Sequence, residues 1–138
     1  MLVFTRFPRR ALAAATSALL LAGMACSNST DNSATVPPHD VLIVSGAQTM
    51  GANAFSPDNK SVTLASGGKI VWANGDYSGG GYGGGSGVTH HLVSDNPEFD
   101  TGNIVPLATA QHTFTTAGTY HYHCTIHPTM TGTITVTP

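Results

Sequence analysis

The sequence predicts an all-β domain, and three observations support this fold class. Beyond the N-terminal segment, apolar residues occur in short runs rich in valine, isoleucine and threonine, which favour strands. Glycine, proline, asparagine and aspartate separate these runs, as expected of turns. No apolar pattern of helical period has a convincing length there, although residues 47–55 have room for a helical turn. The 138-residue chain therefore predicts a β-sandwich or barrel of about seven to eight strands.

The first 25 residues are typical of an export signal. Three arginines precede an apolar run from Ala11 to Ala25, which is the pattern of a charged n-region followed by an h-region. Leu21 to Cys26 resembles a bacterial lipobox, in which the cysteine is lipidated, whereas Gly23 to Ala25 also fits ordinary cleavage. We expect lipidation of Cys26 rather than ordinary cleavage. Either route predicts a periplasmic or cell-surface protein, and lipidation would anchor it to a bacterial membrane.

The sequence divides the chain into three segments. Residues 1–25 are the predicted signal peptide. Residues 26–39 are rich in serine, asparagine, threonine and proline and lack periodicity, which predicts a flexible linker. Residues 40–138 remain, and about 100 residues are enough for one small domain with a single core.

Seven segments of this domain are predicted strands. Each is short, rich in β-branched residues and bounded by turn residues. They are Val41–Ser45, Ser61–Ala65, Lys69–Ala73, Val88–Ser94, Gln111–Thr115, Thr119–Cys124 and Thr131–Thr137.

A glycine-rich segment, Gly75 to Gly87, lies between the third and fourth predicted strands. Glycine loses much conformational freedom on ordering, so this density predicts a mobile loop. We interpret it as a surface insertion. Because it directly precedes a pair of histidines, a role as a flap over them stays open.

The charge of the domain argues against one class of partner. All three arginines lie in the signal, which leaves two lysines and seven acidic residues after residue 25 and a formal charge of −5. An acidic domain without a basic patch is a poor ligand for nucleic acid. We therefore expect no nucleic-acid partner.

The most specific pattern is Cys124-Thr-Ile-His127-Pro-Thr-Met130, which places a thiolate, an imidazole and a thioether at three-residue intervals. Cys124 has no obvious disulfide partner, because Cys26 belongs to the signal junction. A lone thiol outside the cytoplasm is a liability unless it is buried or bound to a metal. Two histidines and one cysteine with a weak axial methionine form the mononuclear blue-copper site used in electron transfer. The pattern predicts such a site, completed by a second histidine.

The second histidine has two candidates, His90 and His91, in the fourth predicted strand. Side chains alternate between the two faces of a strand, so only one of the pair can face the site. Parity slightly favours His90, because it shares its face with Val88 and Leu92. The choice stays open at this point.

The same alternation predicts which side chains before Cys124 point into the core and which point outward. If the cysteine points inward, Tyr120 and Tyr122 point inward with it. His121 and His123 then point outward, which excludes them as ligands of the same ion.

These segments together resemble the cupredoxins, the plastocyanin/azurin family of blue copper proteins. Gly118 to Gly132 resembles their C-terminal copper loop, and its Cys-x-x-His-x-x-Met spacing is most similar to that of amicyanin. Val71 to Asp76 resembles the strand and turn before the first ligand histidine. His90 to Asp95 and Phe99 to Gly102 resemble the family stretch that begins with that histidine. The resemblance extends over residues 41–137 and implies a Greek-key β-sandwich.

The resemblance implies one copper ion cycling between Cu(I) and Cu(II) in a type 1 site. The ligands that it implies are His90, Cys124, His127 and Met130. It implies a monomer that carries single electrons between extracytoplasmic redox proteins by transient docking. We do not expect an enzyme, because the sequence offers no nucleophile, base and orienting group as a set.

One position departs from the family pattern. His91 stands where the family often has an asparagine that braces the copper loop. We therefore expect His91 to contact the region of Thr125.

Other functions remain as alternatives. An extracytoplasmic copper carrier or storage protein would expose exchangeable Cu(I) and carry further methionine or histidine clusters, and the sequence has no such methionine cluster. A relative of multicopper oxidases or nitrite reductases would need further copper motifs from additional domains. Structural zinc is disfavoured, because zinc sites use cysteine, histidine and carboxylate ligands rather than methionine.

Overall fold

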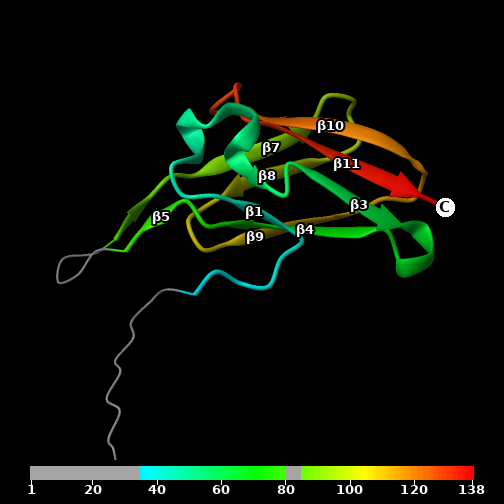
Figure 1. The fold of residues 1–138 in the computed structure, drawn as a ribbon, viewed down its shortest axis with the longest axis horizontal. Coiled ribbons are helices and arrows are strands. Elements are labelled where there is room, and N and C mark those ends of the chain that lie inside the picture. Colours follow the sequence, from blue (N-terminus) through cyan, green and yellow to red (C-terminus); the bar gives the residue numbers. More distant parts are fainter. Residues whose placement is uncertain (1–34, 80–84) are drawn as a thin grey trace, which may run out of the picture. The chain divides into compact units, whose positions relative to one another are not determined.

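Two β-sheets face each other across the core of the domain (Figure 1). The computed structural model describes residues 35–79 and 85–138. The predicted signal peptide (1–25), most of the predicted linker (26–39) and the middle of the glycine-rich segment lie outside the described residues. In the described part of the chain, no helix has the length and apolar character needed to cross a membrane.

One sheet has four strands in the order β2-β1-β4-β9, and the other has five in the order β3-β11-β10-β7-β8. Two further strands, β5 and β6, pair only with each other. The bounds are β1 Val41–Ile43, β2 Phe55–Ser56, β3 Asn59–Thr63, β4 Lys69–Asn74, β5 Tyr77–Ser78, β6 Ser86–Gly87, β7 His90–Ser94, β8 Asp100–Ile104, β9 Thr109–Thr113, β10 Gly118–Cys124 and β11 Thr131–Thr137. The chain crosses repeatedly between the sheets, as in Greek-key sandwiches, and the all-β prediction is confirmed.

The structure contains all seven predicted strands, with ends shifted by a few residues, and four that were not predicted. Three of the four, β2, β5 and β6, have two residues each and leave too little pattern to recognise. The fourth, β8, has the sequence Asp-Thr-Gly-Asn-Ile, in which aspartate, glycine and asparagine are depleted in strands. It forms because β7 supplies an antiparallel partner, with His90 opposite Ile104. The helical turn expected near residues 47–55 is present as two 3-10 helices, η1 (Ala47–Thr49) and η2 (Gly51–Ala54).

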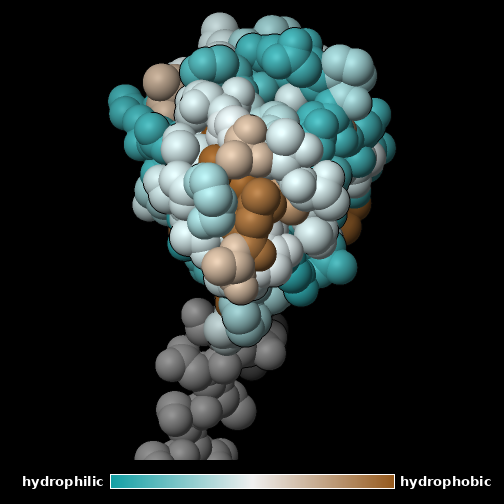
Figure 2. Space-filling view, turned by 90° about the vertical axis from the view of Figure 1, so that its right-hand side faces the viewer, coloured by the Kyte–Doolittle hydropathy of each residue, from teal (hydrophilic) through white to brown (hydrophobic). Residues whose placement is uncertain are grey.

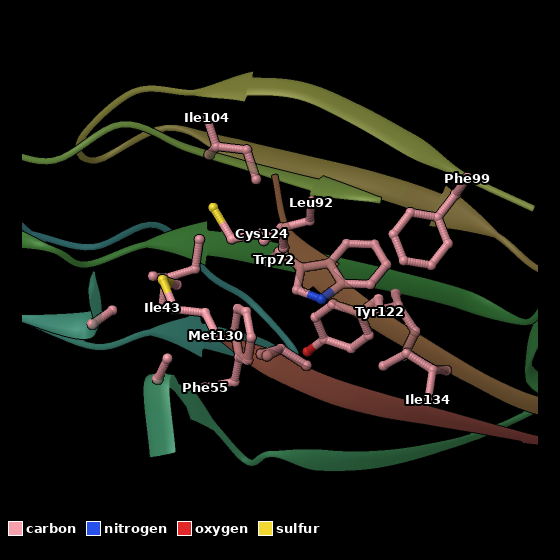
Figure 3. Packing of buried hydrophobic residues seen from close by; sticks show 14 of the residues in the cluster. Ile43, Phe55, Trp72, Leu92, Phe99, Ile104, Tyr122, Cys124, Met130 and Ile134 are labelled. Atoms are coloured by element: carbon pink, nitrogen blue, oxygen red, sulfur yellow. The ribbon is translucent and has the colours of Figure 1, made fainter. Parts of the chain in front are cut away.

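An aromatic cluster joins the two sheets (Figure 3). Trp72 of β4 lies with its ring centroid 5.0 Å from that of Phe99 and 5.9 Å from that of Tyr122 on β10. Phe55 contacts Tyr122 from the other side, with centroids 4.9 Å apart. Strand β10 is therefore held in the core two residues before Cys124.

The alternation predicted for β10 is confirmed. Tyr122 and Cys124 are buried and Tyr120 is half-buried, whereas His121 is exposed and His123 is half-buried. The cluster of buried apolar residues includes Cys124 and continues to Met130 in the loop after β10. One end of the core is therefore lined by sulfur.

The two ends of β11 lie in different surroundings, one at a largely polar surface and the other beside the donor residues. The face at which β11 terminates is mostly hydrophilic or neutral and carries one small apolar area (Figure 2). The loop of residues 125–130 enters β11 at the opposite end. That loop carries the sulfur and imidazole donors singled out by the sequence.

Candidate metal centre

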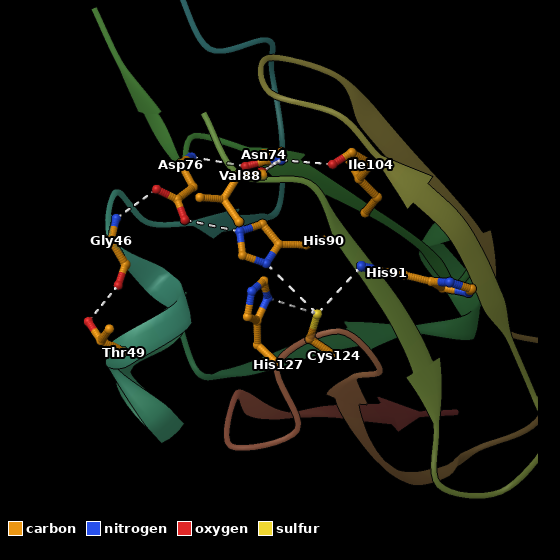
Figure 4. Close-up of polar contacts among 10 residues, drawn as sticks. All are labelled: Gly46, Thr49, Asn74, Asp76, Val88, His90, His91, Ile104, Cys124 and His127. Atoms are coloured by element: carbon orange, nitrogen blue, oxygen red, sulfur yellow. Dashed lines mark hydrogen bonds and ion pairs between the residues drawn. The ribbon is translucent and has the colours of Figure 1, made fainter. Parts of the chain in front are cut away.

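Three side chains bring their donor atoms together at this end of the core. His90 begins β7, Cys124 ends β10, and His127 lies in the loop that follows. Sγ of Cys124 is 3.8 Å from Nδ1 of His90 and 3.8 Å from Nδ1 of His127 (Figure 4). The three donor atoms all lie within 4.8 Å of one another, the sole grouping of this kind among the described histidine, cysteine and acidic residues.

The spacing of these donors fits a single metal ion. Bonds from a first-row metal such as zinc are about 2.0 Å to imidazole nitrogen and 2.3 Å to thiolate sulfur. A sulfur and a nitrogen donor held around one ion at tetrahedral or trigonal angles, with metal–nitrogen bonds of about 2.0 to 2.1 Å, are then about 3.5 to 3.8 Å apart. Both sulfur–nitrogen distances in the structure match this spacing. One thiolate with two imidazoles is also a donor set that transition metals prefer.

Main-chain hydrogen bonds close the loop that carries His127. The N–H of Cys124 donates to the carbonyl of Met130 at 3.1 Å, and the N–H of Met130 donates to the carbonyl of His127 at 3.0 Å. Leu92 of β7 lies opposite Cys124 in register, which places His90 beside the cysteine. Local pairing therefore positions all three donors.

Met130 is fully buried at the end of the same loop. In the view of Figure 3, its sulfur and that of Cys124 lie at the same end of the buried cluster. Its role as the axial ligand stays a prediction.

The structure distinguishes the two adjacent histidines. Along β7, His90, Leu92 and Ser94 are buried, whereas His91 and Val93 are half-buried. The His91 ring points away from the donor group (Figure 4), and its Nε2 contacts the carboxylate of Asp100. His90 is therefore the histidine that the fold places beside Cys124.

His91 nevertheless contacts the loop, through its main chain. Its carbonyl accepts the N–H of Thr125 at 2.8 Å, and its own N–H donates to Sγ of Cys124 at 3.5 Å. The expected contact with the region of Thr125 is present, and it is made by the backbone rather than by the imidazole.

The electrostatics of the donor group favour a thiolate. Burial raises the pKa of Cys124, but hydrogen bonds with the His90 side chain, the His91 and His127 backbones and the His127 side chain outweigh it and lower the pKa to about 6. Burial lowers the pKa of His90, but its contacts with Cys124 and Asp76 raise the pKa by more. The thiolate is the form of cysteine that binds metals.

Sequence reasoning missed the acidic partner of His90. Nε2 of His90 is 3.0 Å from Oδ2 of Asp76, a carboxylate that is 5% exposed. Asp76 follows Asn74 and Gly75 at the end of β4. The position of an acidic residue in the turn after a buried strand could have drawn attention to Asp76. Its pairing with a histidine 14 residues later depends on the fold.

The other histidines of the domain point elsewhere. His121 contacts the hydroxyl of Thr133, and His123 contacts Asp95 at 2.8 Å. The ring of His112 packs against Phe114, with centroids 4.7 Å apart. None of these three belongs to the donor group.

No family model matches the sequence, and no curated protein matches it. Solved structures do match. A purple cupredoxin from Nitrosopumilus maritimus is similar with a TM-score of 0.58 and 23% identity, over 72% of this chain and 100% of that one. The domain has the cupredoxin fold.

Two other solved structures are also similar. The copper-containing nitrite reductase of Thermus scotoductus SA-01 is 28% identical with a TM-score of 0.55, over 74% of this chain. This chain spans only 23% of the length of that enzyme. A reduced variant of amicyanin is 24% identical with a TM-score of 0.46, over 57% of this chain and 69% of that one. The match to the purple cupredoxin, at a TM-score of 0.58, confirms the predicted cupredoxin fold.

Proposed function

We propose that this cupredoxin domain binds one copper ion in a type 1 site and carries single electrons between extracytoplasmic redox partners. The observation that supports this most strongly is a buried cysteine with an imidazole Nδ1 at 3.8 Å on each of two sides. His90, Cys124 and His127 would hold the ion, with Met130 as the axial ligand. Copper supplies a one-electron couple when bound, because soft sulfur ligands suit Cu(I) and imidazoles also suit Cu(II).

The fold keeps these donors in place. Cys124 is fixed by the β10 ladder and by Tyr122 in the aromatic cluster. His90 is fully buried, and the hydrogen bond between Cys124 and Met130 closes the loop. Donors held in one arrangement need little movement when the charge of the ion changes, which suits rapid electron transfer.

His127 provides the route to the surface. His90 and Cys124 are buried and His127 is half-buried, so the ring of His127 is the donor nearest to solvent. Ile126 beside it is 47% exposed. Electrons would enter and leave through the exposed edge of this ring.

Two further exposed apolar side chains lie on neighbouring loops. Met50 is 42% exposed and precedes Gly51, at which an added Cβ would lie 3.7 Å from the carbonyl of Thr129 in the ligand loop. Val105 is 52% exposed and follows Ile104, the residue opposite His90. Small apolar contacts of this kind suit transient docking of a redox protein to a monomeric carrier.

The proposed location rests on the N-terminal sequence. Residues 1–25 have the pattern of an export signal, and Cys26 stands at the position lipidated in lipoproteins. We propose a periplasmic or cell-surface protein attached to the membrane through Cys26. We propose electron carriage rather than catalysis, because one buried thiolate between two imidazoles is the donor set of a blue-copper electron-transfer site.

Repeated redox cycling separates an electron carrier from a copper carrier. The copper-loaded chain is cycled on an electrode and then exposed to a Cu(I) chelator, with His121→Asn as a matched variant on the exposed face of β10. An electron carrier shows a reversible one-electron couple and retains its copper. Loss of copper to the chelator in each reduced phase, without a stable couple, would instead support copper carriage or storage.

A further inference from the structure

A buried carboxylate lies on the far side of His90 from the cysteine (Figure 4). Oδ2 of Asp76 is 3.0 Å from Nε2 of His90, and Nδ1 of the same ring is 3.8 Å from Sγ of Cys124. Asp76 is 5% exposed and His90 is 0% exposed. The imidazole therefore connects a carboxylate to the candidate metal centre through its two nitrogens.

Hydrogen bonds hold both this carboxylate and the main chain that carries it. The N–H of Gly46, which caps η1, donates to Oδ1 of Asp76 at 2.7 Å. The N–H of Asp76 donates to Oδ1 of Asn74 at 2.9 Å. Asn74 is itself fully buried, and its Nδ2 donates to the carbonyls of Val88 and Ile104 at 2.7 and 2.8 Å. Turning the carboxylate away from His90 would break its bond with Gly46, and the buried Asn74 holds the main chain of Asp76 in place.

One basic side chain lies close enough to compensate the negative charge of Asp76. Among the basic side chains of the described residues, His90 is the one that contacts this carboxylate, and Lys60 pairs with Asp40 instead. Burying a carboxylate without compensation is costly. The negative charge is therefore best compensated through His90 and through a cation that His90 holds.

We propose that Asp76 is a positioning residue of the metal centre that also favours its oxidised state. The carboxylate accepts a hydrogen bond from the Nε2–H of His90, which leaves the Nδ1 lone pair directed at the ion. Its negative charge stabilises Cu(II) more than Cu(I), because the oxidised ion carries one more positive charge. The electron comes from a redox protein partner, and no covalent bond changes in the protein. The copper part of this inference rests on the proposed function.

A purely structural role is the competing explanation. Asp76 would then only anchor Gly46 and the turn at the end of β4. Both roles predict that Asp76→Ala destabilises the domain. Only the positioning role predicts a changed preference between Cu(II) and Cu(I) in a variant that keeps the shape of the side chain.

The first test compares Asp76→Asn with Asp100→Asn in the full chain. Both variants remove one negative charge beside a histidine, but Asp100 is an exposed residue whose partner is His91. Cu(II) and Cu(I) affinities are measured by competition. We expect the ratio of Cu(II) to Cu(I) affinity to fall about tenfold or more in Asp76→Asn, a rise in potential of about 59 mV per factor of ten. Because solvent screens the exposed Asp100, the ratio of Cu(II) to Cu(I) affinity should change by less than about threefold in Asp100→Asn.

Either of two results would overturn the effect on copper. One is an unchanged ratio in Asp76→Asn, and the other is an equal change in both variants. Thermal unfolding of the metal-free variants shows whether each one folds, so a structural defect is recognised separately.

The second test needs no metal. Nitrogen-15 NMR of the metal-free chain carrying Cys124→Ala, in which no thiolate competes for a proton on Nδ1, should show the Nε2–H tautomer of the neutral His90 ring. Asp76→Ala should shift the ring towards the Nδ1–H form, and Asp76→Glu should restore it. A tautomer that does not depend on Asp76 would overturn the positioning role. If the tautomer depends on Asp76 but the chain has no redox-active copper, the proposed function and the effect on copper fail while the positioning of His90 stands.

Discussion

The rings of Trp72 and Tyr122 meet edge to face across the two sheets, with their centroids 5.9 Å apart. Tyr122 lies two residues before Cys124 on β10, and Trp72 lies two residues before Asn74 on β4. One contact therefore anchors both strands that lead to the candidate metal centre.

The first prediction concerns this anchor. Tyr122→Ala should lower the free energy of unfolding by about 3 to 5 kcal/mol, because it leaves a large cavity between the sheets. Tyr122→Phe should change it by less than about 1 kcal/mol, because the buried hydroxyl has no hydrogen-bond partner among the described residues. Denaturant unfolding of the metal-free chain measures both. An equal loss of unfolding free energy in both variants would mean that the hydroxyl, rather than the ring, provides the stabilisation.

The second prediction concerns the close packing of Gly132. This residue lies opposite Tyr122 in the β10–β11 ladder, and an added Cβ would lie 2.4 Å from Cζ of the tyrosine ring. Gly132→Ala should therefore cost about 1 to 3 kcal/mol of stability. Gly118→Ala is the matched control, because its Cβ would approach Tyr120 no closer than 3.5 Å. Denaturant unfolding should show a loss below about 1 kcal/mol in the control.

The third prediction separates the two adjacent histidines. His90→Ala should abolish the visible colour of the Cu(II)-loaded chain, because it removes a proposed ligand. His91→Ala should leave the protein coloured, because His91 contacts Cys124 and Thr125 through backbone atoms that alanine retains. Its half-exposed pair with Asp100 is worth about 0 to 1 kcal/mol. A colourless His91→Ala protein beside a coloured His90→Ala protein would reverse the assignment.

The fourth prediction concerns the metal-free thiol. The pKa of Cys124 is about 6, below its usual value of 9.0, so the thiolate fraction should rise with pH around a midpoint near 6. Ultraviolet absorbance of the thiolate measures this titration, and Cys124→Ser gives the background from any other thiol. His127→Ala should move the midpoint to higher pH, because the variant loses a hydrogen bond to sulfur. A midpoint that stays near 6 in this variant would contradict that cause.

Local sequence patterns were sufficient for the strands and for part of the site. Two-residue alternation placed Tyr122 and Cys124 on the buried face of β10 and favoured His90 over His91. The short spacing between Cys124 and His127 is enough to bring their donor atoms together, since one turn of the loop joins them. These inferences depend only on residues close in sequence.

Long-range contacts explain what the sequence did not reveal. Asp76 faces His90 only because β4 and β7 belong to different sheets that meet at this end of the core. Strand β8 has weak intrinsic preference for a strand and depends on pairing with β7. Neither relationship leaves a periodic pattern in the sequence.

The most direct test of the central claim is the visible absorption spectrum of the Cu(II)-loaded chain beside that of Cys124→Ser. A bond between Cu(II) and the Cys124 thiolate gives an intense sulfur-to-copper charge-transfer band, which the serine variant cannot form. We predict a strongly coloured parent, a colourless Cys124→Ser variant and a fully coloured His121→Asn control. A colourless parent that contains one bound Cu(II) ion would contradict the type 1 copper site.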